Sequence, residues 1–249
     1  MHTQQEFITL KNICKSYGSK KVLKDISFTI YKGEVFSLLG VNGAGKTTLS
    51  SIISTLIKKD SGDILFENKS IYTQLATYRH QISFCTQHLS INPALTIEEN
   101  LVFAARFYGI SKEESQKRAK ELMDQFELTS YAQANMHVLS GGYKQRLQLA
   151  RSMMHYPNLI ILDEPTVGMD PRVRETLWKL VLELKKQGVS ILLTTHYLDE
   201  AEYLSDRVCL IDNGLIKAID SPEALKEKLN KKNLNEIFLH LIEEKKEES

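Results

Sequence analysis

The sequence predicts an α/β protein with a doubly wound, mostly parallel β-sheet, and three observations indicate this fold class. Short apolar segments of strand length alternate with segments of helical periodicity in the C-terminal part of the chain, as when helices join parallel strands. Residues 7–13 and 22–30 instead alternate apolar and polar side chains, which is typical of an antiparallel β subdomain. Residues from about 88 to 155 turn helical in pattern, so we expect a helical subdomain inserted in the α/β core.

The N-terminal elements follow from local patterns. Residues 7–13 and 22–30 alternate, so each segment is expected to be a strand with one buried face. Residues 35–39 are apolar except for Ser37 and end at a glycine, which predicts a fully buried strand. A helix is expected over about residues 47–58.

Two predicted helices in the middle of the chain begin with capping boxes. Thr96 and Ser111 are each followed three residues later by a glutamate, so hydroxyl and carboxylate can satisfy amides left unpaired at a helix start. Four residues at helical spacing predict a core face, namely Leu101, Ala104, Ala105 and Tyr108. Phe103 and Phe107 either extend this face or line a groove for a partner.

Strand and helix patterns alternate in the C-terminal part. Buried strands are predicted at residues 159–162, 190–194 and 208–211. Helices are expected after Asp170-Pro171, near residues 199–205, and as a last helix after Ser221-Pro222. Asn213-Gly214 predicts the turn of an edge hairpin.

The composition excludes several classes of protein. Lys+Arg number 32 and Asp+Glu 31, so nothing favours nucleic acid or an anionic membrane surface as the main partner. The three cysteines are far apart, which argues against disulfides or a zinc site and for a reducing cytoplasm. We expect no signal peptide, and the apolar runs are too short to span a membrane. If the protein works at a membrane, another chain would supply the spanning helices.

One loop carries a motif for phosphate binding. Residues 40–47 read GVNGAGKT, which matches G-x-x-x-x-G-K-[ST] between a predicted strand and a helix. Its glycines let backbone N–H groups converge on phosphate oxygens at a helix N-terminus. Lys46 is expected to reach the β- and γ-phosphates, and the Thr47 hydroxyl to bind Mg²⁺. The residues expected to contact the nucleotide are Gly40, Asn42, Gly43, Ala44, Gly45, Lys46, Thr47 and Thr48.

Four further motifs follow this loop in order. Residues 139–146 read LSGGYKQR, residues 159–165 read LIILDEP, residues 168–171 read GMDP, and Thr195-His196 ends a predicted strand. In these motifs the chain resembles the ATP-binding cassette (ABC) ATPases, as their signature, Walker B, D-loop and H-loop. The resemblance covers residues 7 to about 220. It implies a P-loop NTPase domain over 1–220, with the helical subdomain at about 88–155, followed by a C-terminal helix and tail over 221–249.

The resemblance implies roles in ATP hydrolysis for the residues near the phosphates. Asp163 would hold Mg²⁺ together with Thr47, and Glu164 would orient or deprotonate the attacking water. Lys46 would have a catalytic role as well. His196 would sense the γ-phosphate. A simpler alternative exists for two of them: Glu164 as a helix cap or ion-pair partner, and His196 as an ordinary core histidine.

Two single residues fit family positions by their placement relative to the motifs. Gln87 fits the Q-loop, with a catalytic and a Mg²⁺ role, and Tyr17 fits the A-loop that stacks on adenine. Taken alone, each is equally well explained as a surface residue.

The signature segment implies a shared active site. Ser140, Gly141 and Gly142 would form a helix N-terminus that points at the γ-phosphate bound by a second copy. The implied working unit is a head-to-tail homodimer with two ATP molecules between its subunits, and Asp170 lies near that interface.

The motifs favour a nucleotide-binding subunit that docks from the cytoplasm on separate transmembrane permease subunits. Residues 92–109 and 195–202 resemble the ATPases of ABC-2 type exporters. The alternative is a soluble ABC ATPase acting on nucleic acid or ribosomes. The single cassette, and the 94 positions between Lys46 and Ser140, too few for a long coiled coil, argue against it. The signature octamer argues against a P-loop kinase or GTPase.

Overall fold

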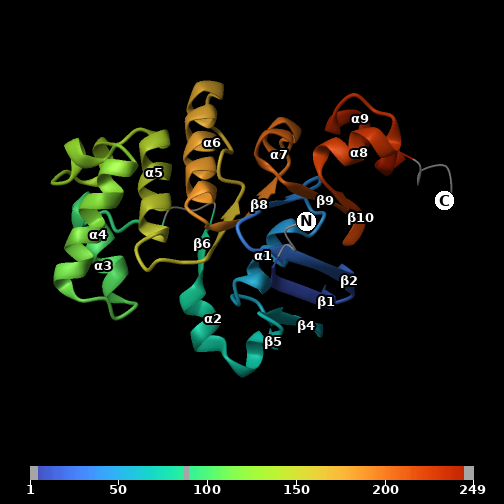
Figure 1. The fold of residues 1–249 in the computed structure, drawn as a ribbon, viewed down its shortest axis with the longest axis horizontal. Coiled ribbons are helices and arrows are strands. Elements are labelled where there is room, and N and C mark those ends of the chain that lie inside the picture. Colours follow the sequence, from blue (N-terminus) through green and yellow to red (C-terminus); the bar gives the residue numbers. More distant parts are fainter. Residues whose placement is uncertain (1–4, 87–89, 244–249) are drawn as a thin grey trace.

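The computed structural model describes residues 5–86 and 90–243, which form two β-sheets and their surrounding helices (Figure 1). The N-terminal sheet is antiparallel and has the strand order β2-β1-β4-β5. Its strands are β1 (Glu6–Tyr17), β2 (Lys20–Tyr31), β4 (Ser61–Phe66) and β5 (Lys69–Ser70). This sheet is the predicted antiparallel subdomain.

The second sheet has six strands in the order β10-β9-β3-β8-β7-β6. Five of them are parallel: β3 (Val35–Leu39), β6 (Ile82–Cys85), β7 (Leu159–Asp163), β8 (Ser190–Thr195) and β9 (Arg207–Asp212). The edge strand β10 (Leu215–Asp220) pairs antiparallel with β9 through the predicted Asn213-Gly214 turn. Because the carboxyl ends of β3, β7 and β8 meet at one edge of the sheet, the loops that follow them converge there.

The helices fall into groups along the chain. The first group follows the early strands and comprises α1 (Lys46–Ile53) and α2 (Leu75–Gln81). The helical lobe, on the left in Figure 1, comprises α3 (Ile97–Arg106), α4 (Lys112–Gln125) and α5 (Gly141–Ser152). The C-terminal group comprises α6 (Pro171–Lys186), α7 (Leu198–Leu204), α8 (Pro222–Leu229) and α9 (Leu234–Glu243).

Buried apolar side chains form three clusters that join these parts. One cluster lies between the two sheets and α1 and includes Phe36 and Leu49. Another joins the parallel sheet to the helical lobe and includes Leu101 and Leu162. The third holds α8 and α9 against the sheet and includes Ile237. The helical lobe therefore shares a continuous core with the sheet that carries the predicted nucleotide loop.

The structure confirms the predicted fold class and corrects some boundaries. The helix expected over about 47–58 ends at Ile53, because Thr55 takes a left-handed backbone with φ 64°. The helix after Ser221 is not the last one. Asn230 ends it in a left-handed conformation with φ 50°, and the Asn233 side chain accepts a hydrogen bond from the Glu236 N–H at the start of α9.

Both predicted capping residues, Thr96 and Ser111, begin helices, but their hydrogen bonds differ. Thr96 and Glu99 make both bonds of a capping box at the start of α3. At the start of α4 the structure shows the hydroxyl half, in which Ser111 accepts from the Glu114 N–H. The predicted core face of α3 is confirmed at Leu101, Ala104 and Ala105, which are buried.

Candidate functional site

The phosphate-binding motif forms the turn between β3 and α1, and close packing fixes its shape. A Cβ added to Gly40 would lie 2.2 Å from the Ile211 carbonyl oxygen, and one added to Gly45 would lie 2.7 Å from Leu23 Cδ2. Gly45 also has φ 111°, a backbone conformation that side chains with a Cβ rarely adopt. Glycine is therefore required at both positions to let the loop pass between β2 and β9.

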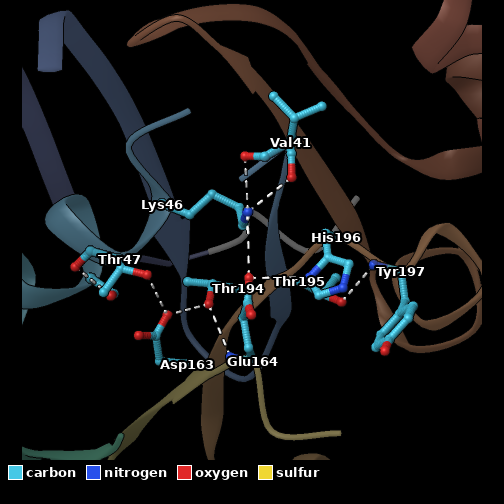
Figure 2. Close-up of polar contacts among 11 residues, drawn as sticks. Val41, Lys46, Thr47, Asp163, Glu164, Thr194, Thr195, His196 and Tyr197 are labelled. Atoms are coloured by element: carbon cyan, nitrogen blue, oxygen red, sulfur yellow. Dashed lines mark hydrogen bonds and ion pairs between the residues drawn. The ribbon is translucent and has the colours of Figure 1, made fainter. Parts of the chain in front are cut away.

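Lys46 folds back into its own loop. Its Nζ donates hydrogen bonds to the carbonyl oxygens of Gly40 at 2.9 Å and Val41 at 3.2 Å, and it lies 3.5 Å from Glu164 Oε1 (Figure 2). The side chain is 4% exposed. Burial lowers the pKa of Lys46, while the Glu164 carboxylate acts in the opposite direction. The ammonium is thus held by carbonyl oxygens and one carboxylate at the point where the motif places phosphate.

Asp163 ends β7 and lies in register with Thr194 of the neighbouring strand β8. Its Oδ1 accepts a hydrogen bond from Thr194 Oγ1 at 2.5 Å and from Thr47 Oγ1 at 3.4 Å. Burial raises the pKa of Asp163, and these two hydrogen bonds partly offset that effect. Strand register and the loop after β3 therefore bring the two predicted Mg²⁺ ligands, Thr47 and Asp163, together.

Glu164 contacts two other residues that the sequence assigned to the site, Lys46 and His196. Its carboxylate Oε1 lies 3.2 Å from His196 Nδ1 and 3.5 Å from Lys46 Nζ, so the three side chains point toward one another in Figure 2. The backbone of Glu164 has φ 50°, and its N–H donates to the Thr194 carbonyl oxygen at 3.0 Å. A left-handed backbone is costly for a residue with a side chain, and such strain occurs preferentially at functional sites. Because of this turn, the side chains of the neighbouring residues Asp163 and Glu164 point in different directions.

The signature residues begin α5 as predicted. The Ser140 side chain accepts a hydrogen bond from the Tyr143 N–H at 3.5 Å, and both Ser140 and Gly141 are exposed. A Cβ added to Gly142 would lie 2.6 Å from Val173 Cγ1 on α6, so glycine permits the close approach of the two helices. Asp170 is the N-cap residue of α6 and is exposed. The signature helix N-terminus and Asp170 are thus accessible to another molecule.

The structure places some of the remaining predicted site residues in the phosphate loop and leaves the roles of others untested. Asn42, Gly43, Ala44 and Thr48 lie in the loop and the first turn of α1 as the motif requires. Tyr17 ends β1 with 49% of its surface exposed, and Lys15 Nζ lies 5.5 Å from the centre of its ring. An adenine contact for Tyr17 remains a prediction. Gln87 lies outside the described residues.

Two polar residues of the site, Thr194 and Glu200, were not predicted from the sequence. Thr194 bonds both Asp163 and the Glu164 backbone, and Glu200 is fully buried and accepts bonds from Thr166 Oγ1 and Trp178 Nε1. Burial raises the pKa of Glu200, and its hydrogen bonds partly offset that effect. Glu200 ties the segment after Glu164 to α6 and α7. The signal for Thr194 was a hydroxyl at the end of an apolar strand.

A glycine-rich loop around a buried lysine, with a hydroxyl and two carboxylates at the same sheet edge, defines a P-loop nucleotide hydrolase. The family model described as ABC transporter matches residues 23–167, more than half of the chain. The chain belongs to the ABC transporter family, as an ATP-binding and ATP-hydrolysing subunit. The resemblance drawn from the motifs is therefore confirmed.

Several known ATP-binding proteins are similar to this chain in sequence. The chain is 40% identical over 230 residues to the doxorubicin resistance ATP-binding protein DrrA of Mycobacterium tuberculosis, covering 92% of this chain and 70% of that protein. It is 41% identical over 219 residues to the linearmycin resistance ATP-binding protein LnrL of Bacillus subtilis, covering 88% of this chain and 70% of that protein. It is 35% identical over 238 residues to a Nod factor export ATP-binding protein of Bradyrhizobium diazoefficiens, covering 96% and 78%.

Two solved structures illustrate the structural likeness. An ATP-binding subunit of an ABC transporter has a TM-score of 0.84 at 30% identity, covering 95% of this chain and 99% of that one. A dimeric ATP-binding cassette bound to ADP and Pi has a TM-score of 0.77 at 29% identity, covering 86% of this chain and 98% of that one. Within residues 5–86 and 90–243, we find no helix long and apolar enough to cross a membrane.

Proposed function

We propose that this chain is the cytoplasmic, peripheral ATPase subunit of an exporter, that it hydrolyses ATP as a head-to-tail homodimer, and that separate transmembrane permease subunits carry the cargo. The observation that carries the proposal is the contact of Glu164 with both Lys46 and His196 beside the phosphate loop. The names of relatives given above for drug resistance and Nod factor export support the exporter assignment. The near-neutral charge argues against nucleic acid as the partner.

The geometry suits hydrolysis of a terminal phosphate. Lys46 has two bonds to loop carbonyl oxygens that it can exchange for phosphate oxygens. Glu164 is a carboxylate poised to accept a proton from water, and its bond to His196 orients it. A bound phosphate would attract Lys46 away from Glu164 and so free the carboxylate for the water.

The residues present fit a Mg²⁺ ion that enters with the nucleotide. Thr47 and Asp163 supply one hydroxyl and one carboxylate within 3.4 Å of each other, and Mg²⁺ in phosphate sites is commonly held by one or two protein oxygens plus phosphate and water. When bound, the ion would neutralise charge on the β- and γ-phosphates. Gln87 is proposed as a further ligand from its place in the sequence.

The proposed dimer uses the exposed signature helix. A helix N-terminus has N–H groups without partners inside the helix and a partial positive charge, and at the start of α5 both Ser140 and Gly141 are exposed. We expect it to face the γ-phosphate held by the other copy, with Asp170 close to the same interface.

A mixing experiment tests this shared site. Ser140→Arg should leave nucleotide binding to the single chain intact but abolish hydrolysis, and Lys46→Ala should abolish nucleotide binding. In a mixed dimer the two defects fall in one site and leave the other intact, so ATP should be trapped at one site per mixed dimer. ATPase activity should also return on mixing, provided that one site can turn over alone. Absence of trapping would count against the shared site.

Fractionation tests the membrane assignment. The chain should sediment with membranes from cells that also express the membrane proteins encoded beside it, and it should remain in the supernatant without them. If it stays in the supernatant in both cases, a soluble ABC ATPase becomes the better hypothesis.

A further inference from the structure

Glu200 is a buried carboxylate to which the proposed reaction assigns no role. It lies in the first turn of α7 and is 0% exposed. Its Oε1 accepts hydrogen bonds from Thr166 Oγ1 at 2.8 Å and from Trp178 Nε1 at 2.9 Å. Burial raises the pKa of Glu200, and hydrogen bonds from Thr195, Thr166 and Trp178 oppose this rise. Burying a carboxylate among neutral donors costs free energy, so these contacts fix geometry more than they add to stability.

Thr166 belongs to the turn that carries Glu164. It follows Glu164 by two positions and is buried. The Val167 N–H donates to the Glu164 carbonyl oxygen at 3.4 Å, which closes the turn around Thr166. The bond from the Thr166 hydroxyl to Glu200 therefore fixes this turn on the side that follows Glu164.

The turn is strained and is held on both sides. Glu164 has φ 50°, and a residue keeps such a backbone conformation only where the surrounding structure holds it there. Before the turn, the Glu164 N–H donates to the Thr194 carbonyl oxygen at 3.0 Å and lies 3.1 Å from Thr194 Oγ1. After the turn, Thr166 is bonded to Glu200. Loss of this second contact would let Glu164 relax while the first contact remains.

Glu200 also lies close to His196 along the chain. Tyr197, which follows His196, is the N-cap residue of α7, and its carbonyl oxygen accepts a hydrogen bond from the Ala201 N–H at 3.2 Å. Glu200 is therefore in the helical turn that begins directly after His196. Its bond to Thr166 joins the start of α7 to the turn that follows β7.

Helix α6 holds Glu200 in place. In Figure 1, α6 and α7 lie side by side, and Trp178 of α6 donates to the Glu200 carboxylate. The Trp178 ring stacks on the ring of Tyr203 of α7, with their centres 5.1 Å apart. Arg174 Nη2 of α6 lies 3.5 Å from Asp199 Oδ2 of α7. Glu200 is thus fixed within a helix pair, and a movement of the turn relative to this pair would break its contacts.

We propose that Glu200 is a positioning residue for ATP hydrolysis, whose buried carboxylate holds the turn after β7 against the start of α7 and so maintains the contact of Glu164 with His196. This inference rests on the proposed function and adds a residue that acts on the reaction only through others. The contact measures 3.2 Å, and a displacement of about 1 Å can lower a rate about 100-fold. Binding of ATP depends instead on the phosphate loop, so it should survive the loss of Glu200.

Removal of the acceptor tests the proposal in the full chain. Glu200→Leu fills the space without an acceptor and should lower kcat about tenfold to 100-fold. The Kd for a non-hydrolysable ATP analogue with Mg²⁺, measured by titration calorimetry, should stay unchanged. Glu200→Gln keeps an amide oxygen that can accept both bonds, so it should retain most of the wild-type kcat. An equal loss of kcat in Glu200→Gln, or a Kd that rises as much as kcat falls, would overturn the proposal.

A second variant and a control separate positioning from folding. Thr166→Val removes the donor with little change in shape and should also lower kcat. Combined with Glu200→Leu, it should cause no further loss, because both changes break one contact. The matched control is Glu34→Leu, which removes another buried carboxylate, bonded to the Tyr31 N–H at 2.6 Å and located at the end of β3 away from the phosphate loop. It should lower the melting temperature and leave kcat unchanged, with all variants assayed below their melting temperatures. Wild-type kcat in Thr166→Val, or a loss in Glu34→Leu as large as in Glu200→Leu, would contradict a positioning role.

A Glu164→Gln background distinguishes this proposal from the proposed role of Glu164. Without the base, adding Glu200→Leu should lower the residual single-turnover rate by much less than about tenfold, and the ATP-dependent dimer should still form in gel filtration. A further loss of about tenfold or more, or loss of the dimer, would show that Glu200 does not act through Glu164. Near-normal turnover in Glu164→Gln would remove the proposed base, and this inference with it. If Glu164→Gln is inactive but Glu200→Leu keeps the wild-type kcat, only the positioning role is wrong.

Discussion

The nucleotide edge of the parallel sheet and the groove between the α/β core and the helical lobe differ in how their charges are satisfied. We call the latter the interlobe groove, and its lining includes Arg79, Phe84, Phe107, Arg151 and His155. At the nucleotide edge, Lys46, Glu164 and His196 form one connected set, and Asp163 accepts bonds from two threonines. In the groove, no aspartate or glutamate is among the described residues that line it together with Arg79 and Arg151. The first region is preorganised by its own chain. The second region has positive charge that an anionic group of another molecule could pair with.

This difference has a physical basis in strand register. Asp163 lies opposite Thr194 because β7 and β8 are parallel neighbours, and both strands end at the sheet edge where the phosphate loop begins. The groove depends instead on how the helical lobe packs against the core. Changes at the nucleotide edge should therefore alter chemistry, and changes in the groove should alter binding to a partner.

The largest effect is expected for Glu164→Gln. Loss of the carboxylate that accepts the proton should lower kcat by about 10²- to 10⁴-fold, while ATP binding persists because Lys46 and Thr47 remain. The variant should accumulate as an ATP-dependent dimer, which gel filtration measures. A matched control, Glu183→Gln, removes a carboxylate paired with Lys186 on the surface of α6 and should leave kcat unchanged. Near-normal turnover in Glu164→Gln would remove Glu164 from its role.

The nucleotide edge could be predicted from the sequence, whereas the interlobe groove could not. The phosphate loop, Asp163 and Glu164 lie in contiguous motifs at the ends of apolar strands, so local pattern and spacing were sufficient to place them together. The interlobe groove was not predicted as a charged surface, because Arg79 and Arg151 lie on helices far apart in the chain and follow no common period. Only the packing of α2 and α5 against β6 brings them to one hollow.

A smaller effect is expected for the exposed aromatic side chains of the helical lobe. Phe107 lines the interlobe groove, and Phe103 lines a second groove on the helical lobe, between α3 and α4, which we call the outer groove. The two rings contact edge to face, with their centres 4.9 Å apart. Polar substitution at exposed positions among Leu95, Phe103 and Phe107 should weaken membrane recruitment without lowering the ATPase activity of the isolated chain. Leu95 is only partly exposed, so the clearest comparison is Phe107→Ser against Phe103→Ser.

Fractionation with purified-protein ATPase assays measures this comparison. If the partner occupies the interlobe groove, Phe107→Ser should reduce recruitment about tenfold and Phe103→Ser should reduce it less. The reverse order would move the docking surface to the outer groove. Equal recruitment of both variants and the wild type would show that neither aromatic contributes to docking.

The capping box of α3 should affect folding stability rather than chemistry. Thr96→Ala removes the hydroxyl that accepts the Glu99 N–H bond at 3.2 Å and should lower the free energy of unfolding by about 1 kcal/mol. Thr96→Ser keeps the hydroxyl and serves as the matched control. Urea unfolding measures both variants. A loss equally large in Thr96→Ser would assign the effect to the methyl group instead of the cap.

The smallest effect is expected from His155, which stacks on Tyr108 beside the interlobe groove with ring centres 3.7 Å apart. Its Nε2 donates to the Ile82 carbonyl oxygen at 3.0 Å, which fixes the neutral tautomer. Burial, reinforced by His80, lowers the pKa of His155 from 6.5, although the bond to Ile82 opposes this shift. At a pH between the folded value and 6.5, the unfolded chain therefore binds more protons.

The contribution of neutral His155 to stability is thus complete above pH 6.5 and is lost as the pH falls through the folded value. His155→Phe keeps an aromatic ring on Tyr108 but does not titrate. From about pH 7.5 to about pH 5.5, the free energy of unfolding of the wild type should therefore fall relative to that of His155→Phe. Urea unfolding at each pH measures this change. Parallel curves for the two proteins across that range would show that protonation of His155 costs the folded state nothing, and that this side of the groove accepts a further positive charge freely.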